Sequence, residues 1–185
     1  LVTKIGGPSV KSYHPPGLYE QVTAGSGTDV YVEGTGEDLY RRSMYTFWKR
    51  TCPPPTMSMF DAPTRETCTI RRARTNTPLQ ALVVWNDPEF HEAALALAGR
   101  VMFAGDAGSD DAFRVRWLWR QCLLREPTVH ERDRVLELLR DERRHLAADP
   151  AAVAAMVATG REGAAEELAA WAVVCGVVMN LDEFL

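Results

Sequence analysis

The spacing of apolar residues changes along the chain and divides it into stretches of different character. Residues 1–36 contain seven of the thirteen glycines together with three prolines, so regular structure should be sparse there. Within this arm, residues 29–33 alternate apolar and polar side chains and are partly β-branched, which predicts one short strand, half of a small hairpin. From Glu37 to Arg50 the apolar residues recur at helical spacing, and this pattern predicts the first helix.

The second half of the chain has the pattern of a helical bundle. Thr77 with Gln80, and Thr128 with Glu131, have the spacing of capping boxes, so each threonine should begin a helix. Asp87 precedes Pro88, a pair that can begin a further helix because Asp caps well and Pro fits the first helical position. Long or strongly apolar helical patterns cover residues 88–103, 110–124, 128–146, 150–160 and 164–180.

These patterns predict a mainly α protein in which an irregular N-terminal arm, residues 1–36, precedes a helical domain, residues 37–185. Residues 51–76 interrupt the helical domain, because three prolines at 53–55 end the first helix and no clear period follows. Loops of this length are unusual in compact domains and tend to be functional or held by side chains. In the bundle, helical spacing places four residues in a common core, namely Leu136, Leu139, Trp171 and Val174.

Composition and charge narrow the kinds of partner. With 46% hydrophobic and 25% charged residues the chain should fold, and its longest uncharged stretch, residues 168–181, is shorter than the roughly 20 residues of a membrane span. The net charge of −4 conceals an asymmetry, since eight basic and two acidic residues lie between Arg41 and Arg74. Such a block can attract an anionic partner or pair with acids of the same protein. The acidic overall balance argues against nucleic-acid binding.

The densest polar cluster lies between Arg71 and Asn76. A guanidinium can bind a carboxylate, sulfate or phosphate through two parallel hydrogen bonds, so an anion or sugar site is one interpretation. The other is that these side chains hold the long loop together by bonding backbone carbonyls and acids such as Asp61 and Glu66. Trp48 precedes Lys49 and stands near the prolines, a combination that can form a platform for a sugar or peptide. The tentative ligand-binding set is Trp48, Lys49, Asp61, Arg65, Arg71, Arg72, Arg74 and Asn76.

The sequence contains no familiar catalytic or metal-binding motif. His91 and Glu92 are not followed by the second His of HExxH, and a Gly-rich phosphate loop, a nucleophile elbow and an EF-hand pattern are absent. The four cysteines show neither CxxC nor CxxCH spacing, so neither zinc nor covalent haem is indicated. Cys52 and Cys68 lie in polar loop sequence, where they either pair in an oxidising compartment or remain free thiols. Because the chain starts at Leu1 and not at Met, we expect it to be part of a longer chain.

Several short motifs follow one another in order over nearly the whole chain and resemble a known family. The sequence is similar to the planctomycete-specific C-terminal domain known as domain of unknown function 1553. It departs slightly from that family at Val84-Trp85, where two leucines are expected, and at Cys52, where a small residue is expected. The motifs include Gly6-Gly7-Pro8, Asp38-Leu39-Tyr40-Arg41-Arg42-Ser43, Tyr45-Thr46-Phe47-Trp48-Lys49-Arg50, Arg74-Thr75-Asn76-Thr77-Pro78-Leu79-Gln80 and Asn180-Leu181-Asp182-Glu183-Phe184-Leu185.

The resemblance implies a setting and no established chemistry. It implies a large extracytoplasmic protein, periplasmic or secreted, that often carries a planctomycete-type cytochrome c domain and another domain upstream, so any haem c would belong to an upstream part. One hypothesis is a docking or anionic-ligand-binding module, whose partners are upstream domains of the same chain or an anionic polysaccharide. The alternative is that the segment completes a hydrolase-like or redox active site, with Arg72, Arg74 and Asn76 binding substrate. Whether the protein is an enzyme stays open at this stage.

Overall fold

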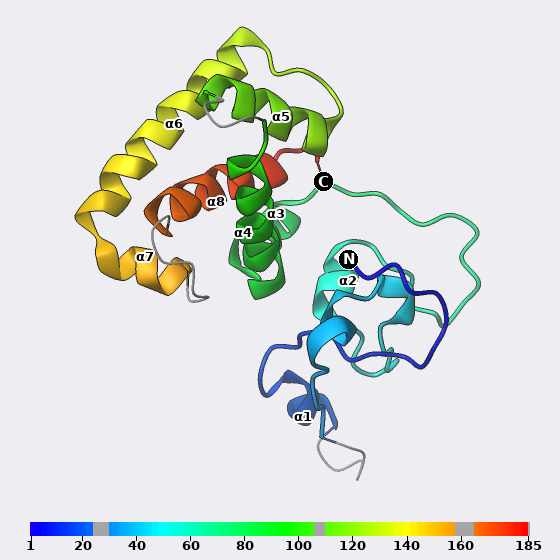
Figure 1. The fold of residues 1–185 in the computed structure, drawn as a ribbon. Coiled ribbons are helices and arrows are strands. Elements are labelled where there is room, and N and C mark those ends of the chain that lie inside the picture. Colours follow the sequence, from blue (N-terminus) through cyan, green and yellow to red (C-terminus); the bar gives the residue numbers. More distant parts are fainter. Residues whose placement is uncertain (24–29, 106–109, 158–164, 185) are drawn as a thin grey trace. The chain divides into compact units, whose positions relative to one another are not determined.

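The computed structural model describes residues 1–23, 30–105, 110–157 and 165–184 (Figure 1). Its internal contacts divide the chain into two compact units, Leu1–Thr77 and Pro78–Leu185. The sequence suggested a boundary between an irregular arm and a helical domain at residues 36 and 37. The residues that follow this point nevertheless contact the arm, because Arg41 bridges Val2 and Thr46 bridges Val10. The arm and the segment that follows it therefore belong to the same unit.

The first unit consists mostly of irregular chain with short helical turns (Figure 1). Extended pairing among its described residues is limited to isolated bridges. The short strand predicted at 29–33 does not form at residues 30–33, and residue 29 lies outside the described residues. The elements of this unit are α1 (Leu18–Thr23), η1 (Gly36–Tyr40), η2 (Ser43–Tyr45) and α2 (Pro55–Met59), where η denotes a 3-10 helix.

The single helix predicted from Glu37 to Arg50 is wrong, because only the two 3-10 turns η1 and η2 form in that range. The backbone groups that a helix would use internally are bonded to the arm instead. The Val10 N–H donates to the Tyr45 carbonyl at 2.8 Å, and the Phe47 N–H donates to the Val10 carbonyl at 2.7 Å. Pairing with a distant segment has overridden the local helical pattern, which is a weak prior in tertiary context.

The second unit is a helical bundle, and the predicted mainly α fold class is confirmed. The capping box at the start of α6 is confirmed too, since Thr128 Oγ1 accepts from the Glu131 N–H at 3.2 Å and Glu131 Oε2 accepts from the Thr128 N–H at 2.7 Å. The cap at Thr77 stays a prediction. The helices are α3 (Pro78–Asn86), α4 (Pro88–Met102), α5 (Asp111–Leu123), α6 (Val129–Ala148), α7 (Pro150–Met156) and α8 (Ala165–Met179).

Helix α8 lies at the centre of the bundle and contacts each of the other five helices (Figure 1). It is apolar nearly all round, as expected of a helix that other helices surround. Of the four predicted core residues, Leu139, Trp171 and Val174 have no exposed surface, whereas Leu136 is half-buried at the edge of the core. The residues that α8 buries are Ala169, Ala170, Trp171, Ala172, Val174, Cys175, Val178 and Met179.

Replacing Trp171 by alanine should lower the free energy of unfolding by about 3–5 kcal/mol, the usual cost of removing a buried aromatic side chain. Trp85→Ala is the matched control, because the Trp85 side chain is about half exposed. Its replacement should cost clearly less. Urea unfolding of both variants measures the difference, and equal losses would contradict the central position of α8.

Thr128→Ala should destabilise the fold by about 1 kcal/mol, because the Glu131 amide loses its side-chain acceptor. Thr128→Ser keeps a hydroxyl at the same position and should retain most of the stability. Thermal unfolding of the two variants side by side tests the cap. A serine variant as unstable as the alanine variant would show that packing of the methyl group, and not the hydrogen bond, is responsible.

Candidate functional site

Residues 63–76, which we call the polar loop, contain five of the eight tentative ligand-binding residues and are exposed at every position. Within the part of the chain that the structure describes, residues 63–74 form no backbone–backbone hydrogen bond. The side chains of Pro63–Asn76 are thus displayed on a segment that neither a helix nor a sheet supports.

The two ends of the polar loop are held by side-chain hydrogen bonds. Asp61 Oδ2 accepts from both the N–H and the hydroxyl of Thr75, each at 2.8 Å. Arg72 Nη2 donates to the carbonyl of Phe60. One of the two interpretations of the arginine cluster was that its side chains hold the loop by bonding backbone carbonyls. Arg72 makes such a bond. The carboxylate of Asp61, however, accepts from a threonine where the sequence suggested an arginine.

Arg65 and Trp48, two of the tentative site residues, are in direct contact. The Arg65 guanidinium carbon lies 4.6 Å from the centre of the Trp48 ring, a cation–π arrangement. Arg65 adopts a left-handed backbone conformation with φ of 63°, which is uncommon for a residue with a long side chain. Because the guanidinium covers this face of the indole, the face is not open for a sugar, and the Arg65 N–H groups remain the part that a ligand can meet.

The remaining members of the predicted set do not gather around Trp48. Arg71, Arg74 and Asn76 are exposed and form no hydrogen bond or ion pair with other described residues. Lys49 contacts an aromatic ring instead, since its ammonium lies 4.7 Å from the centre of the Tyr19 ring. Arg71, Arg74 and Asn76 are therefore exposed along one loop, each without a polar partner among the described residues.

An aromatic cluster near Lys49 was missed by the sequence analysis. The ring centres of His14 and Tyr31 are 4.7 Å apart, those of Tyr19 and Tyr31 5.2 Å, and Tyr31 donates its hydroxyl proton to the Ser12 carbonyl at 2.6 Å. Burial lowers the pKa of His14, opposed in part by the charge of Glu20. The rings come from irregular chain, where no periodicity indicates which side chains meet.

A second missed feature is Arg41, which is buried in the first unit. Its Nη2 donates to the Gly6 carbonyl at 2.7 Å and to the Lys4 carbonyl at 3.3 Å, and its guanidinium stacks on Tyr45 at 4.0 Å. The Gly6 N–H donates to the Tyr45 hydroxyl at 2.9 Å, and this bond, followed by nearby arginine charge, lowers the pKa of Tyr45. Arg41 therefore fastens the N-terminal arm to the segment around Tyr45.

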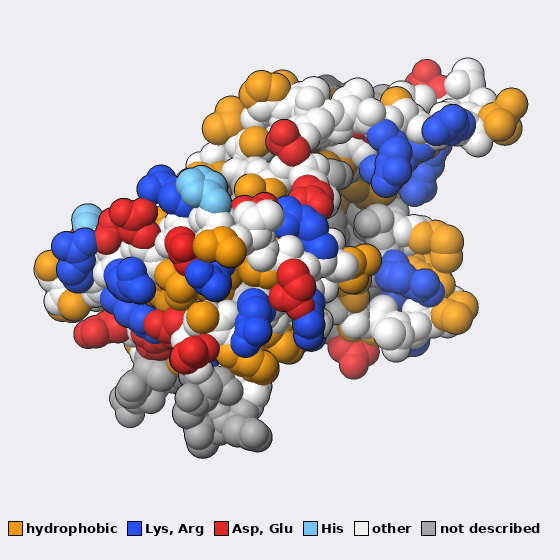
Figure 2. All heavy atoms as spheres, turned by 90° about the horizontal axis from the view of Figure 1, so that it is seen from above, with side chains coloured by type: hydrophobic (Ala, Val, Ile, Leu, Met, Phe, Trp, Pro, Cys, Tyr) orange, Lys and Arg blue, Asp and Glu red, His pale blue; other side chains and the backbone are white. Residues whose placement is uncertain are grey.

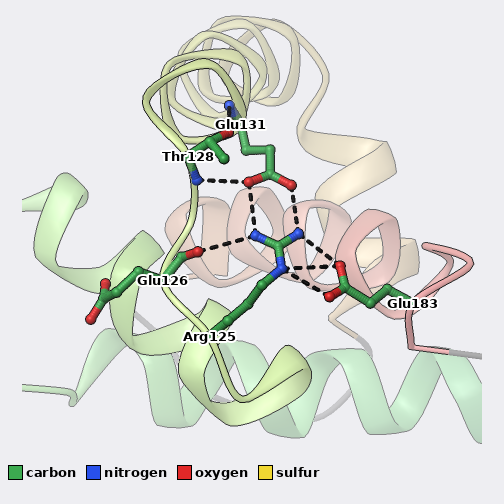
Figure 3. A network of polar contacts seen from close by, with 5 residues as sticks. All are labelled: Arg125, Glu126, Thr128, Glu131 and Glu183. Atoms are coloured by element: carbon green, nitrogen blue, oxygen red, sulfur yellow. Dashed lines mark hydrogen bonds and ion pairs between the residues drawn. The ribbon is translucent and has the colours of Figure 1, made fainter.

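In the second unit, Arg125 and Arg143 are each paired with two acids. Arg125 bonds Glu131 through two nitrogens at 2.7 and 2.9 Å, and it also bonds Glu183 (Figure 3). Arg143 pairs with Asp111 and Glu167, and the same Glu167 accepts from the Trp171 indole N–H at 2.9 Å. Acidic and basic side chains are interspersed over much of one face of the molecule (Figure 2).

The described residues hold neither a metal-binding cluster nor a disulfide. No three His, Cys, Asp or Glu side chains there gather in a way that could hold a metal ion. All four cysteines are free, so the possible Cys52–Cys68 disulfide is not formed; Cys52 is buried and Cys68 is exposed. Burial raises the pKa of the Cys52 thiol, which disfavours the reactive thiolate. None of the described helices is both long and apolar enough to cross a bilayer.

The architecture is a helical bundle, Pro78–Leu185, preceded in the chain by a unit of mostly irregular structure, Leu1–Thr77. The model of the family described as PSD1, protein of unknown function (DUF1553), matches residues 1–139. The chain belongs to this family. Comparisons with curated proteins and with solved structures each give no significant match.

The unfolding free energy should decrease as the pH falls from about 4.5 to about 2, because Arg125 and the Thr128 amide lower the pKa of Glu131 to about 2. A carboxyl whose pKa is depressed in the folded state stabilises above its unfolded pKa and loses that contribution as it protonates. Arg125 lowers the pKa of Glu183 in the same direction.

Arg125→Gln should therefore make stability less dependent on pH in this range. The control is Arg134→Gln, which removes an exposed pair with Glu137 on the same helix, α6, and should leave the slope unchanged. Denaturant unfolding at a series of pH values measures the slopes. A steep, unaltered dependence in Arg125→Gln would assign the acid sensitivity to other carboxyls.

Proposed function

We propose that Leu1–Thr77 is a non-catalytic recognition unit that binds an acidic ligand through the arginines of the polar loop. The distribution of charge supports this proposal. Leu1–Thr77 contains ten basic and seven acidic residues, a formal charge of +3, whereas Pro78–Leu185 contains eleven basic and eighteen acidic residues, a charge of −7. A locally positive unit in an acidic chain raises the concentration of anions near its own surface.

The observation that carries the proposal is the contrast between two sets of arginines. Arg125 and Arg143 of the second unit are each bonded to two carboxylates. Arg71 and Arg74 of the polar loop are exposed and have no acidic partner within the described residues. A guanidinium that no acid occupies keeps its planar fork of donors for bidentate binding of a carboxylate, sulfate or phosphate.

The ligand that suits this display is an anionic polysaccharide, a chain with repeated acidic groups. Exposed ion pairs are individually weak, of the order of 1 kcal/mol or less, so affinity at such a surface depends on several contacts acting together. Arg65, Arg71 and Arg74 occur at intervals along an extended loop and can contact successive acidic groups of one polymer. Arg65 is held in place by its stacking on Trp48, which reduces the conformational freedom that it loses on binding.

The family resemblance supplies the wider setting of the proposal. We place the chain outside the cytoplasm as a module of a longer, cytochrome-linked protein. Upstream domains of that protein are its further docking partners. An acidic polymer outside the cell is a ligand that a recognition unit in this setting can reach.

Titration with a panel of sulfated and carboxylated polysaccharides tests the proposal. Arg71→Gln combined with Arg74→Gln should weaken binding by up to about fivefold for each lost ion pair, taken as about 1 kcal/mol. Melting should change little, since substitutions at exposed positions usually alter stability by no more than about 0.5 kcal/mol.

The control is Arg134→Gln combined with Arg144→Gln, which changes the net charge equally at exposed positions of α6. If the control weakens binding as much as the loop variant, the interaction depends on net charge and not on the polar loop. If the unchanged protein binds none of the polymers, the proposed function is wrong.

A further inference from the structure

The backbone of the polar loop has the properties of a protease substrate. Residues 63–74 form no backbone–backbone hydrogen bond within the described chain, and the side chain of Ile70 is fully exposed. The segment precedes the boundary between the two compact units at Thr77 and Pro78. Exposed segments of this kind are preferred sites of limited proteolysis.

A protease must bind its substrate in extended form, with backbone groups paired to the enzyme in the manner of an added strand. Six of the twelve exposed arginines that the structure describes lie in helices and cannot be presented in that way. Arg134 and Arg144, for example, lie within α6, whose backbone amides are bonded inside the helix. Cleavage there requires local unfolding, and its rate falls with the population of the unfolded form. The polar loop can be cut without that cost.

The contacts within the loop select one bond. Arg65 is stacked on Trp48, and Arg72 donates to the Phe60 carbonyl, so each side chain must leave a partner to enter a specificity pocket. Arg74 precedes Thr75, whose N–H and hydroxyl are both held by Asp61. Arg71 has an exposed side chain with no hydrogen bond or ion pair to described residues, and it follows the exposed Ile70.

We propose that the Arg71–Arg72 peptide bond is a processing site for an arginine-specific endoprotease. Hydrolysis adds one water across the amide: the C–N bond breaks, Arg71 gains a carboxylate and Arg72 gains an amino group. The products are Leu1–Arg71 and Arg72–Leu185, so all six helices of the second unit stay in one fragment. This inference is independent of the proposed ligand, because it depends on backbone exposure and not on anion binding.

Limited digestion with trypsin tests the proposal on the full 185-residue chain. Arg161 lies outside the described residues, so the assay uses an Arg161→Gln background. The first product should begin at Arg72, as identified by intact mass and N-terminal sequencing. Arg71→Gln should slow cleavage at this position by about a hundredfold or more, because the buried acid of the specificity pocket is left unpaired. Arg134→Gln, the control, should leave the rate unchanged.

Asp61→Ala gives a second, independent measurement. It removes the acceptor of the Thr75 N–H and hydroxyl, so a cut after Arg74 should appear beside the cut after Arg71. First cleavage within α4 to α8, or a polar loop cut after Arg65 or Arg74 in the otherwise unchanged chain, would overturn the assignment. So would an Arg71→Gln variant whose loop is cut at the original overall rate. Simultaneous cuts in the loop and in α6 would show that digestion follows global unfolding.

Discussion

The second unit depends above all on the burial of α8. An apolar helix without a polar face can be stable in water only if other helices cover it on every side, and α3 to α7 supply that cover. Within the helix, the indole N–H of the buried Trp171 donates to Glu167, one turn earlier in α8. Glu167 is paired with Arg143, and Arg143 also reaches Asp111 at the start of α5. The core residue and the ion cluster therefore position each other.

Arginines serve three different purposes in this chain. Arg125 and Arg143 connect elements by binding two acids each. Arg41 is buried and fastens backbone carbonyls of the arm. Those of the polar loop are displayed to solvent, with only Arg65 and Arg72 tied to neighbouring groups. The sequence places Arg41 and the arginines of the polar loop in one basic block, residues 41–74, although Arg41 is buried and the polar loop is exposed.

The sequence predicted the second unit well and the first unit poorly, for a physical reason. Helices such as α6 follow local rules, namely a capping box at Thr128 and apolar residues at helical spacing, and these rules were sufficient to locate them. In the first unit the backbone of Tyr45 and Phe47 pairs with Val10, and no local pattern reports a partner more than thirty residues away. The candidate site was predictable as a cluster of arginines. The stacking of Arg65 on Trp48 and the attachment of Thr75 to Asp61 depend on that irregular fold and were not predictable.

The carboxylate of Glu131 has two tasks, and this couples parts of the chain that are distant in sequence. It caps the first turn of α6 through the Thr128 N–H, and it holds Arg125, which also holds Glu183 beyond α8 (Figure 3). Fraying of residues 181–184 would free one side of the Arg125 guanidinium and weaken its hold on the cap. The start of α6 and the segment after α8 should therefore open together, as one cooperative unit with shared protection of their amides from exchange.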